Sequence, residues 1–355
     1  CNMGVILKCQ SKTEEAVAAY KTALNLSPDY AEAHKNLGGI YDEQNRMEDA
    51  LPCYEKFIQY QPNHPDPYFR IGFLIHRQGK YEEAINYYRK AIELKPDYIE
   101  AYNNMGAAIK ELGRHDDAIA CYRKLLEIQP DHVKAICNMG VVYQTKGEYE
   151  AAIACYEKSI ALDPNYAEVY NNIGTAKKDR GELDDAEKYF RKAIEIQPDY
   201  AEAHNNLGVL LQSQDRLVEA IPCFEKAISL KPDYVEAFYN QAIALQGLNR
   251  LDEAVAAYRN ALKIKPDYAD AFFAMGLTYV AMDYKQDAVQ SFEEAIRLAP
   301  DFADAHYNLA LLYVQQGWSK EAEERLKQVI KIRPDYVEAH YNLGVGYVDE
   351  NRYED

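Results

Sequence analysis

The chain has 355 residues, 48% of them hydrophobic, and its 40 basic and 57 acidic side chains give a formal charge of −17 at pH 7. This surplus of carboxylates argues against a nucleic-acid surface, because phosphate binding needs clustered Lys and Arg, and it disfavours anionic membranes. No apolar run is long enough for a transmembrane helix, and no basic start precedes an apolar run, so the sequence predicts neither a membrane span nor a signal peptide.

Proline marks an internal repeat. Ten prolines recur every 34 residues, from Pro28 and Pro62 to Pro334, without an insertion. With each proline at position 32 of a repeat, position 8 is Gly in nine repeats and Ala in two, position 20 is always Ala, and position 24 is aromatic in nine of ten. Small residues that face large ones let two helices approach closely, so each unit is predicted to be a helix pair.

The elements of one unit follow from the residue types at its positions. Apolar or small residues at positions 3, 4, 7, 8, 10 and 11 predict the first helix. Position 15 holds Gly, Asn or Asp, which tolerate the left-handed conformation that ends a helix. A second apolar run between positions 20 and 30 predicts the second helix, which the proline ends. The Asp or Asn that follows, with Glu three residues later, predicts a capping box, as in Asp29 and Glu32 or Asp233 and Glu236.

These units fill the chain as a single array over residues 1–355. We expect an all-α, right-handed superhelical solenoid of 34-residue helix-turn-helix repeats. Because the chain opens at position 5 and closes at position 19 of a repeat, without a polar capping helix, we expect sequence beyond both termini, or end-to-end self-association through the uncapped repeats. The predicted boundaries are 1–30 (partial), 31–64, 65–98, 99–132, 133–166, 167–200, 201–234, 235–268, 269–302, 303–336 and 337–355 (partial).

The combination of Gly at position 8, Ala at 20, an aromatic at 24 and Pro at 32 resembles the tetratricopeptide repeat over the whole chain. Segments such as AEAHNNLGVLL (201–211) and CNMGVVYQ (137–144) resemble the repeat region of nucleocytoplasmic protein O-glycosyltransferases, of the O-GlcNAc transferase type. This resemblance implies a protein-binding array. It also implies that an asparagine ladder holds polypeptides along the groove, as it does in that family.

No catalytic constellation appears in the sequence. It contains no Gly-rich phosphate loop, no HExxH, no GxSxG and no paired CxxC, so we expect no enzymatic activity and no cofactor. His306 and His340 share position 4 of adjacent repeats, where a metal pair is one interpretation and packed aromatic substitutes are the favoured one. Four cysteines share position 23 and are expected to be reduced residues of a cytoplasmic protein. They are Cys53, Cys121, Cys155 and Cys223.

A surface is therefore the expected site of function. In stacked helix pairs the first helices line a concave groove, and positions 2, 5, 6, 9, 12 and 13 share the stripe that should face it. Position 6 is Asn in nine of eleven repeats, and a side-chain amide can pair with both the N–H and the C=O of an extended peptide. The alternative is that these amides are solvated family background. The predicted ladder is Asn36, Asn104, Asn138, Asn172, Asn206, Asn240, Asn308 and Asn342, and Asn2 occupies the same position.

An aromatic strip divides the predicted groove. Position 5 becomes aromatic in the last repeats, at Tyr239, Phe273, Tyr307 and Tyr341. Position 12 changes in step from Lys or Gln to Val280, Val314 and Val348. An exposed strip of this kind marks a binding surface, and packing against the neighbouring repeat is the alternative.

Taken together, the sequence predicts a scaffold that binds an extended protein or peptide in its groove. The acidic surplus favours basic segments as partners, and we expect no nucleic-acid or membrane partner and no bound metal. Two alternatives stay open at this point. In the first, the array is the substrate-recognition arm of a protein O-glycosyltransferase whose catalytic domain lies outside this chain. In the second, it is a structural, oligomerising array.

Overall fold

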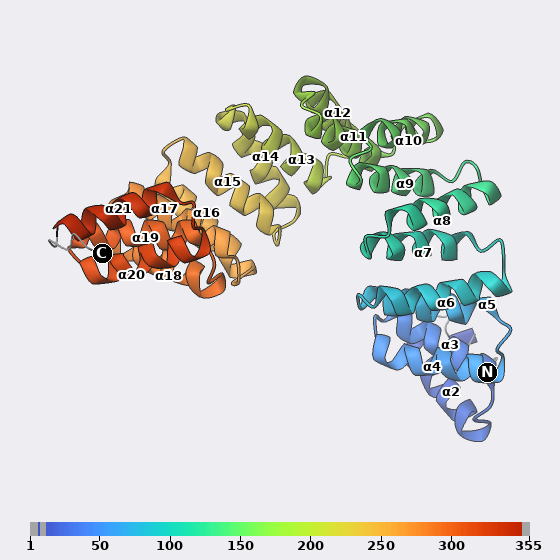
Figure 1. Cartoon of the computed structure of the whole chain (residues 1–355). Helices are drawn as coiled ribbons and strands as arrows, with labels where there is room; N and C mark the ends of the chain where they lie inside the picture. The colour runs from blue at the N-terminus through green and yellow to red at the C-terminus, as the bar shows by residue number, and fades with distance from the viewer. Residues whose placement is uncertain (1–5, 8–11, 350–355) are drawn as a thin grey trace. The chain divides into compact units, whose positions relative to one another are not determined.

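The computed structural model describes residues 6–7 and 12–349. In that part the chain forms twenty α-helices joined by short turns (Figure 1). The prediction of an all-α array of helix pairs is confirmed. The helices are α2 (Thr13–Leu26), α3 (Ala31–Glu43), α4 (Met47–Tyr60), α5 (Pro65–Arg77), α6 (Tyr81–Leu94), α7 (Ile99–Glu111), α8 (His115–Ile128), α9 (Val133–Thr145), α10 (Tyr149–Leu162), α11 (Ala167–Asp179), α12 (Leu183–Ile196), α13 (Ala201–Ser213), α14 (Leu217–Leu230), α15 (Val235–Gly247), α16 (Leu251–Ile264), α17 (Ala269–Ala281), α18 (Lys285–Leu298), α19 (Ala303–Gln316), α20 (Ser319–Ile332) and α21 (Val337–Asp349).

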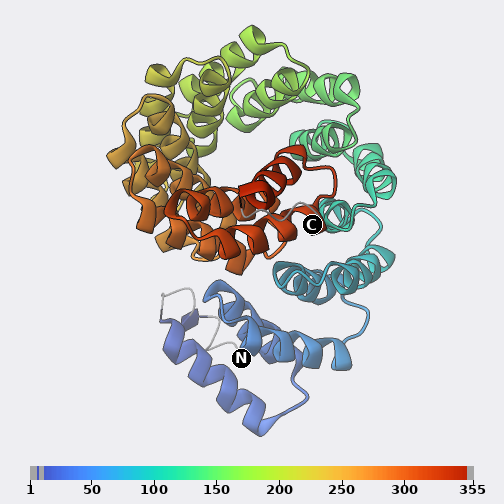
Figure 2. The same ribbon diagram turned by 60° about the vertical axis from the view of Figure 1, so that its left-hand side comes forward.

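The chain divides into two compact units, residues 1–176 and 177–355. In the first unit α3 packs on α4, α5 on α6, α7 on α8 and α9 on α10. In the second unit α13 packs on α14, α15 on α16, α17 on α18 and α19 on α20. Within each unit the second helix of one pair also packs on the first helix of the next pair, as α6 does on α7 and α14 on α15 (Figure 2). Each unit is therefore a continuous stack.

The first helices form the inner face of each unit. Successive first helices touch directly: α5 with α7, α7 with α9, α13 with α15, and α15 with α17. In the described part of the chain, no two successive second helices approach each other as closely. A stack whose first helices are closer together than its second helices curves toward the first helices. We call the exposed side of the first helices the inner face.

Glycine at position 8 lets the two helices of a pair come together. A Cβ atom on Gly208 would lie 2.6 Å from Cε1 of Phe224, and one on Gly140 would lie 2.6 Å from Cε1 of Tyr156. Both rings are fully buried, as is the alanine at position 20 from Ala50 to Ala288. The small-against-large packing predicted from the repeat is confirmed, because the ring at position 24 occupies the space that a side chain at position 8 would need.

The turn inside each pair matches its prediction, but the helix start does not. Gly and Asn or Asp at position 15 have positive φ, as at Gly113 (71°) and Asn45 (59°). The predicted capping boxes are wrong where caps are described: Tyr30 and Tyr234, not the preceding Asp residues, are the N-caps, and neither makes a side-chain cap hydrogen bond. The helix starts one residue later than the capping box requires, so the following glutamate lies too early in the first turn to cap it.

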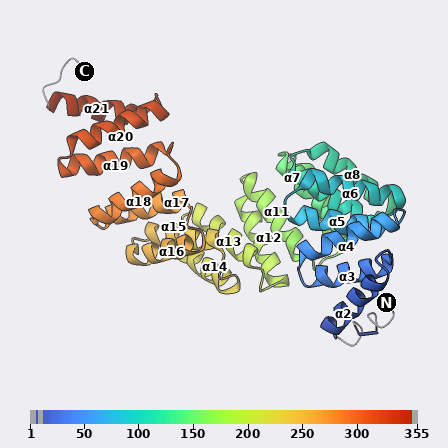
Figure 3. The same cartoon turned by 90° about the horizontal axis from the view of Figure 1, so that it is seen from below.

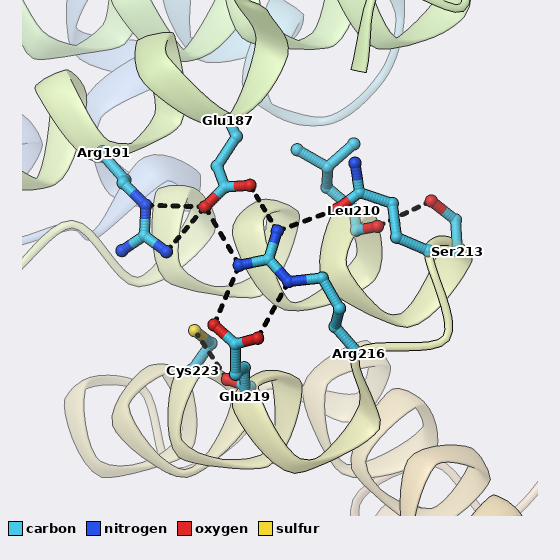
Figure 4. Close-up of polar contacts among 8 residues, drawn as sticks. Glu187, Arg191, Leu210, Ser213, Arg216, Glu219 and Cys223 are labelled. Atoms are coloured by element: carbon cyan, nitrogen blue, oxygen red, sulfur yellow. Dashed lines mark hydrogen bonds and ion pairs between the residues drawn. The ribbon is translucent and has the colours of Figure 1, made fainter. Parts of the chain in front are cut away.

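Charged side chains link successive second helices on the outside of the second unit. Arg216 donates from Nη1 to Oε2 of Glu187 on α12 (2.6 Å) and from Nη2 to Oε2 of Glu219 on α14 (2.8 Å). Arg191 completes the network at 2.7 Å from Glu187 Oε1 (Figure 4). Hydrogen bonds from Arg216 and Arg191 hold the pKa of Glu187 below its usual range, against the opposing effect of its burial.

Candidate functional site

Four of the position-6 asparagines donate a hydrogen bond to the preceding repeat. All eight predicted ladder residues are half-buried on first helices, whereas Asn2 lies outside the described residues. Asn138 donates from Nδ2 to Oδ1 of Asn103 (3.1 Å), and Asn240 donates in the same way to Asn205 (3.2 Å). Each bond runs from position 6 to position 5 of the repeat before it. The amides of Asn138 and Asn240 are therefore oriented by the preceding repeat, and binding of a peptide by the row stays a prediction.

The residue at position 5 decides whether this bond forms. Asn342 donates to Oη of Tyr307 (3.0 Å), and Asn172 donates to Sγ of Cys137 (3.7 Å). Asn308 follows a repeat with Phe273 at position 5, which has no acceptor, and it donates instead to the carbonyl of Asp304 in its own helix (2.8 Å). The pairing of positions 5 and 6 is a feature that sequence reasoning missed, although the constant spacing between the two asparagines of each pair is readable in the sequence.

In the middle repeats position 5 is buried, whereas the helical stripe predicted that it faces the groove. Cys137 is completely buried, and Asn171 and Asn205 are each 6% exposed. The next repeat contacts this position, because its position-6 asparagine donates to Asn103, Cys137 or Asn205. Positions 5 and 6 therefore have different roles, with position 5 in the seam between repeats and position 6 at the edge of that seam.

Three of the four aromatic residues at position 5 pack in the same seam. Tyr239 lies 5.1 Å from the ring of Tyr268, Phe273 lies 4.8 Å from Phe302, and Tyr307 lies 5.0 Å from Tyr336, measured between ring centroids. All three are half-buried, and burial raises the pKa of Tyr239. The packing alternative accounts for them. Each partner ring stands at position 34 of the same repeat, which is a sequence signal that the prediction overlooked.

Tyr341 differs from these three aromatics, because 71% of its side chain is exposed. Val280 and Val314 at position 12 are also exposed. Val348 lies in α21, but its side chain is outside the described residues. A role of the aromatic strip in peptide binding stays a prediction, and the exposed aliphatic residues beside it form part of the inner face.

Histidine at position 4 is a packing residue. Nε2 of His306 donates to the carbonyl of Pro300 (3.1 Å), and Nε2 of His340 donates to the carbonyl of Pro334 (2.9 Å). His34 and His204 make the same bond to their own preceding prolines. In the part of the chain that the structure describes, no group of three His, Cys, Asp or Glu residues is arranged to hold a metal. These bonds agree with the packing interpretation of the histidine pair.

The cysteines are free thiols with little reactivity. Cys53, Cys155 and Cys223 are half-buried and Cys121 is buried. Burial raises the pKa of Cys121 to about 12 and that of Cys155 to about 11, which leaves almost no thiolate at neutral pH. The prediction that these thiols are unpaired is confirmed for the described residues.

A charged pocket lies on the inner face of the first unit. It encloses about 410 Å³ between α3, α5 and the start of α7, and Lys35, Arg70, Asp42 and Asp66 line it. Arg70 lies 3.6 Å from Asp42, and Tyr98 donates to Asp66 at 3.1 Å, so both aspartates have partners inside the pocket. The sequence argument did not identify this pocket.

Known protein families match this arrangement. The sequence profile described as "Cilia and flagella-associated protein 70 C-terminal domain" matches residues 98–308. The chain belongs to this tetratricopeptide-repeat family. Profiles of the tetratricopeptide repeat itself match residues 4–44, 31–64, 53–86, 75–113 and 303–336. No curated protein matches the sequence.

Solved structures share the fold. A tetratricopeptide-repeat protein from Parabacteroides merdae is 18% identical, with a TM-score of 0.59 over 70% of this chain and 98% of that chain. The Cut9–Hcn1 hetero-tetramer of the APC/C is 15% identical, with a TM-score of 0.56 over 95% of this chain and 83% of that chain. PilF of Pseudomonas aeruginosa is 23% identical, with a TM-score of 0.51 over 57% of this chain and 92% of that chain.

Tetratricopeptide arrays present stacked helices to protein and peptide partners, so this chain is a protein-interaction array. Residues 6–7 and 12–349 contain no helix with both the length and the apolar character that a membrane crossing requires. The finer resemblance to the O-glycosyltransferase repeats stays a prediction.

Proposed function

We propose that the array is a scaffold that binds extended polypeptides along the inner face, with the position-6 asparagines pairing with the peptide backbone. The observation that carries this proposal is the row of amides held by hydrogen bonds between repeats, at 3.1 Å for Asn138, 3.2 Å for Asn240 and 3.0 Å for Asn342. Groups that are already oriented lose less conformational entropy when a partner binds.

The remaining hydrogen-bonding capacity of each amide suits a peptide backbone. Nδ2 carries two hydrogens, of which the bond between repeats uses one, and Oδ1 has two lone pairs. The bond between repeats therefore leaves one N–H donor and the carbonyl acceptor of Asn138 and Asn240 unused. A backbone in an extended conformation presents the complementary pair at every residue, whatever its side chains.

Replacing the ladder residues of the first unit tests this proposal. Each amide pair contributes about 0.5–1.5 kcal/mol net. The triple variant Asn104→Ala, Asn138→Ala and Asn172→Ala should therefore lose about 2–4 kcal/mol, or roughly 30- to 1000-fold in affinity. The probe is a fluorescein-labelled, unstructured, uncharged peptide without proline, titrated against the full chain by anisotropy. A matched peptide with several prolines should bind more weakly, because proline removes N–H donors.

Two controls separate binding from folding. Asn86 lies on the second helix α6 and accepts from Arg89, so Asn86→Ala removes an asparagine that does not belong to the ladder. The bonds of Asn138 and Asn172 also join repeats, so the triple variant should unfold at a lower urea concentration, and titrations belong well below that concentration. Equal affinities of wild type and triple variant for the probe would refute the ladder.

We further propose that the chain itself is not catalytic and that it acts in the cytoplasm, in or near a cilium or flagellum. The support for this location is the family, whose name places cilia and flagella-associated protein 70 in those organelles. Immunofluorescence of the tagged natural protein against an axonemal marker tests it, and exclusion from the organelle would refute it. An O-glycosyltransferase arm is the other candidate, and sequencing the natural transcript beyond these residues decides between the two.

A further inference from the structure

The inner face of the last repeats carries aliphatic side chains that nothing covers in the described structure. Val280 on α17 is 40% exposed, Val314 on α19 is 55% exposed, and Val345 on α21 is 42% exposed. In the middle repeats position 12 is polar, as in Lys110, and the change to valine is confined to the end of the chain. Exposed aliphatic residues in adjacent repeats are typical of an interaction surface.

A cavity opens beside these valines. It has a volume of about 230 Å³ and lies between α19, α20 and α21, which are neighbours in Figure 3. Apolar side chains line it, so the aliphatic surface continues from Val314 toward α21. Its lining includes Leu311, Val314, Leu326, Leu343, Val345 and Tyr347.

The charges on this part of the inner face are all of one sign. From residue 235 to residue 349, positions 2, 6, 9, 12 and 13 hold no Lys or Arg, whereas earlier repeats have Arg70, Lys110 and Lys134 at these positions. Position 2 is acidic in each of the last four repeats. Asp304 pairs with Arg333 at 3.0 Å, but Glu236, Asp270 and Glu338 are exposed and form no ion pair with any residue that the structure describes.

The carboxylates and the valines lie on either side of position 6, which is Asn on α15, α19 and α21 and Ala274 on α17. A helix rises about 1.5 Å per residue, so position 2 lies about 6 Å from position 6 along the helix in one direction, and positions 9 and 12 lie about 5–9 Å away in the other. Successive side chains of an extended segment point in opposite directions. A backbone lying over the amides would then direct alternate side chains toward the carboxylates and toward the valines.

We propose that the inner face of α15, α17, α19 and α21 recognises an extended segment in which Lys or Arg alternates with aliphatic residues. The aliphatic side chains contact Val280 and Val314, and the basic side chains reach Glu236, Asp270 and Glu338. This inference rests on the proposed function, because it places a peptide backbone along the same asparagine row. It adds the charge and the side-chain pattern of the partner.

A short fluorescein-labelled peptide that alternates lysine and valine is the probe, titrated by anisotropy against the full chain. The double variant Val280→Ser and Val314→Ser should bind it at least ~10-fold more weakly, because it removes the apolar contacts. The double variant Glu236→Gln and Asp270→Asn should bind about 3- to 10-fold more weakly and with less dependence on salt. Val218→Ser is the matched control, because this exposed valine lies on the second helix α14 and should leave the affinity unchanged.

Two results would overturn the proposal. They are unchanged binding by the Val280→Ser and Val314→Ser variant, and equal binding of a peptide that alternates glutamate and valine. Concentration-dependent dimers in sedimentation that disappear in the valine variant would assign the surface to a second copy, which also contradicts the proposal. If the affinity for the uncharged probe still depends on Asn104, Asn138 and Asn172 in the first unit, the proposed function stands while this inference fails.

Discussion

The two glycines Gly208 and Gly344 occupy position 8 of different repeats, and alanine should have opposite effects at the two sites. At Gly208 a Cβ atom would lie 2.6 Å from Cε1 and 2.9 Å from Cδ1 and Cζ of Phe224, a ring that is fully buried and has no room to move. Overpacking of this kind costs about 1–3 kcal/mol. Alanine regains about 0.5–1 kcal/mol over glycine inside a helix, so the net loss at Gly208 should be about 1–2 kcal/mol.

At Gly344 a Cβ atom would meet nothing within 4 Å among the residues that the structure describes, so only the gain in helix propensity remains. Gly344→Ala should stabilise α21 by about 0.5–1 kcal/mol. The two variants thus share the chemical change and the repeat position and differ only in what faces the new methyl group.

Repeat arrays open locally, so amide hydrogen exchange is the appropriate measurement, with urea unfolding followed by circular dichroism beside it. Exchange over α13 and α14 should be about 5- to 30-fold faster in Gly208→Ala, and exchange over α21 should be up to about 5-fold slower in Gly344→Ala. The same sign of change in both variants would refute the packing argument, since it would mean that Phe224 does not occupy the space next to Gly208.

Further predictions concern the seam, the outer ion pairs and catalysis. Phe273→Ala should destabilise the array by about 2 kcal/mol, because this half-buried ring packs 4.8 Å from Phe302. Tyr341 is exposed at the same repeat position, so Tyr341→Ala should change stability by less than about 0.5 kcal/mol. Equal shifts of the urea midpoint in the two variants would contradict the packing of position 5 between repeats. The pKa of Glu187 is lowered in the folded state by its bonds to Arg216, so this pair stabilises above the unfolded pKa and loses its effect as pH falls through the folded pKa. Glu187→Gln should therefore lower stability by at most about 1 kcal/mol at pH 7, because solvent screens the exposed arginine. The difference in stability between the variant and the wild type should disappear in acid. A difference that stays constant across pH would refute the stabilising role of the ionised Glu187. Incubation of the purified chain with labelled nucleotide sugars and a cell extract should give no incorporation, and any transfer would show that the array is catalytic.

The residues changed in the two binding tests belong to different units of the chain. Asn104, Asn138 and Asn172 lie in the first unit, and Val280 and Val314 lie in the second. Partner chemistry should therefore be measured for each unit with its own probe and its own variants, the uncharged peptide for the asparagine row and the lysine–valine peptide for the valines.

The helix pairs and the contacts inside them could be predicted from the sequence, because they depend on residues close together in the chain. Gly208 and Phe224 belong to one repeat, and the left-handed turn at Asn45 depends on a single residue. Periodicity also placed the asparagines at one position of the first helix. The start of each first helix was shifted by one residue, because the turn after proline, rather than the aspartate side chain, sets where helical geometry begins.

Which edge of the inner stripe is covered depends on tertiary packing. Positions 5 and 6 are neighbours on a helical wheel, and the wheel gives no reason to bury Asn205 and leave Asn240 at the edge of the seam. The rotation and separation between successive pairs decide this, and they result from many packing contacts at once. For that reason the sequence placed Phe273 on an exposed strip, whereas the structure places it against Phe302 between two repeats.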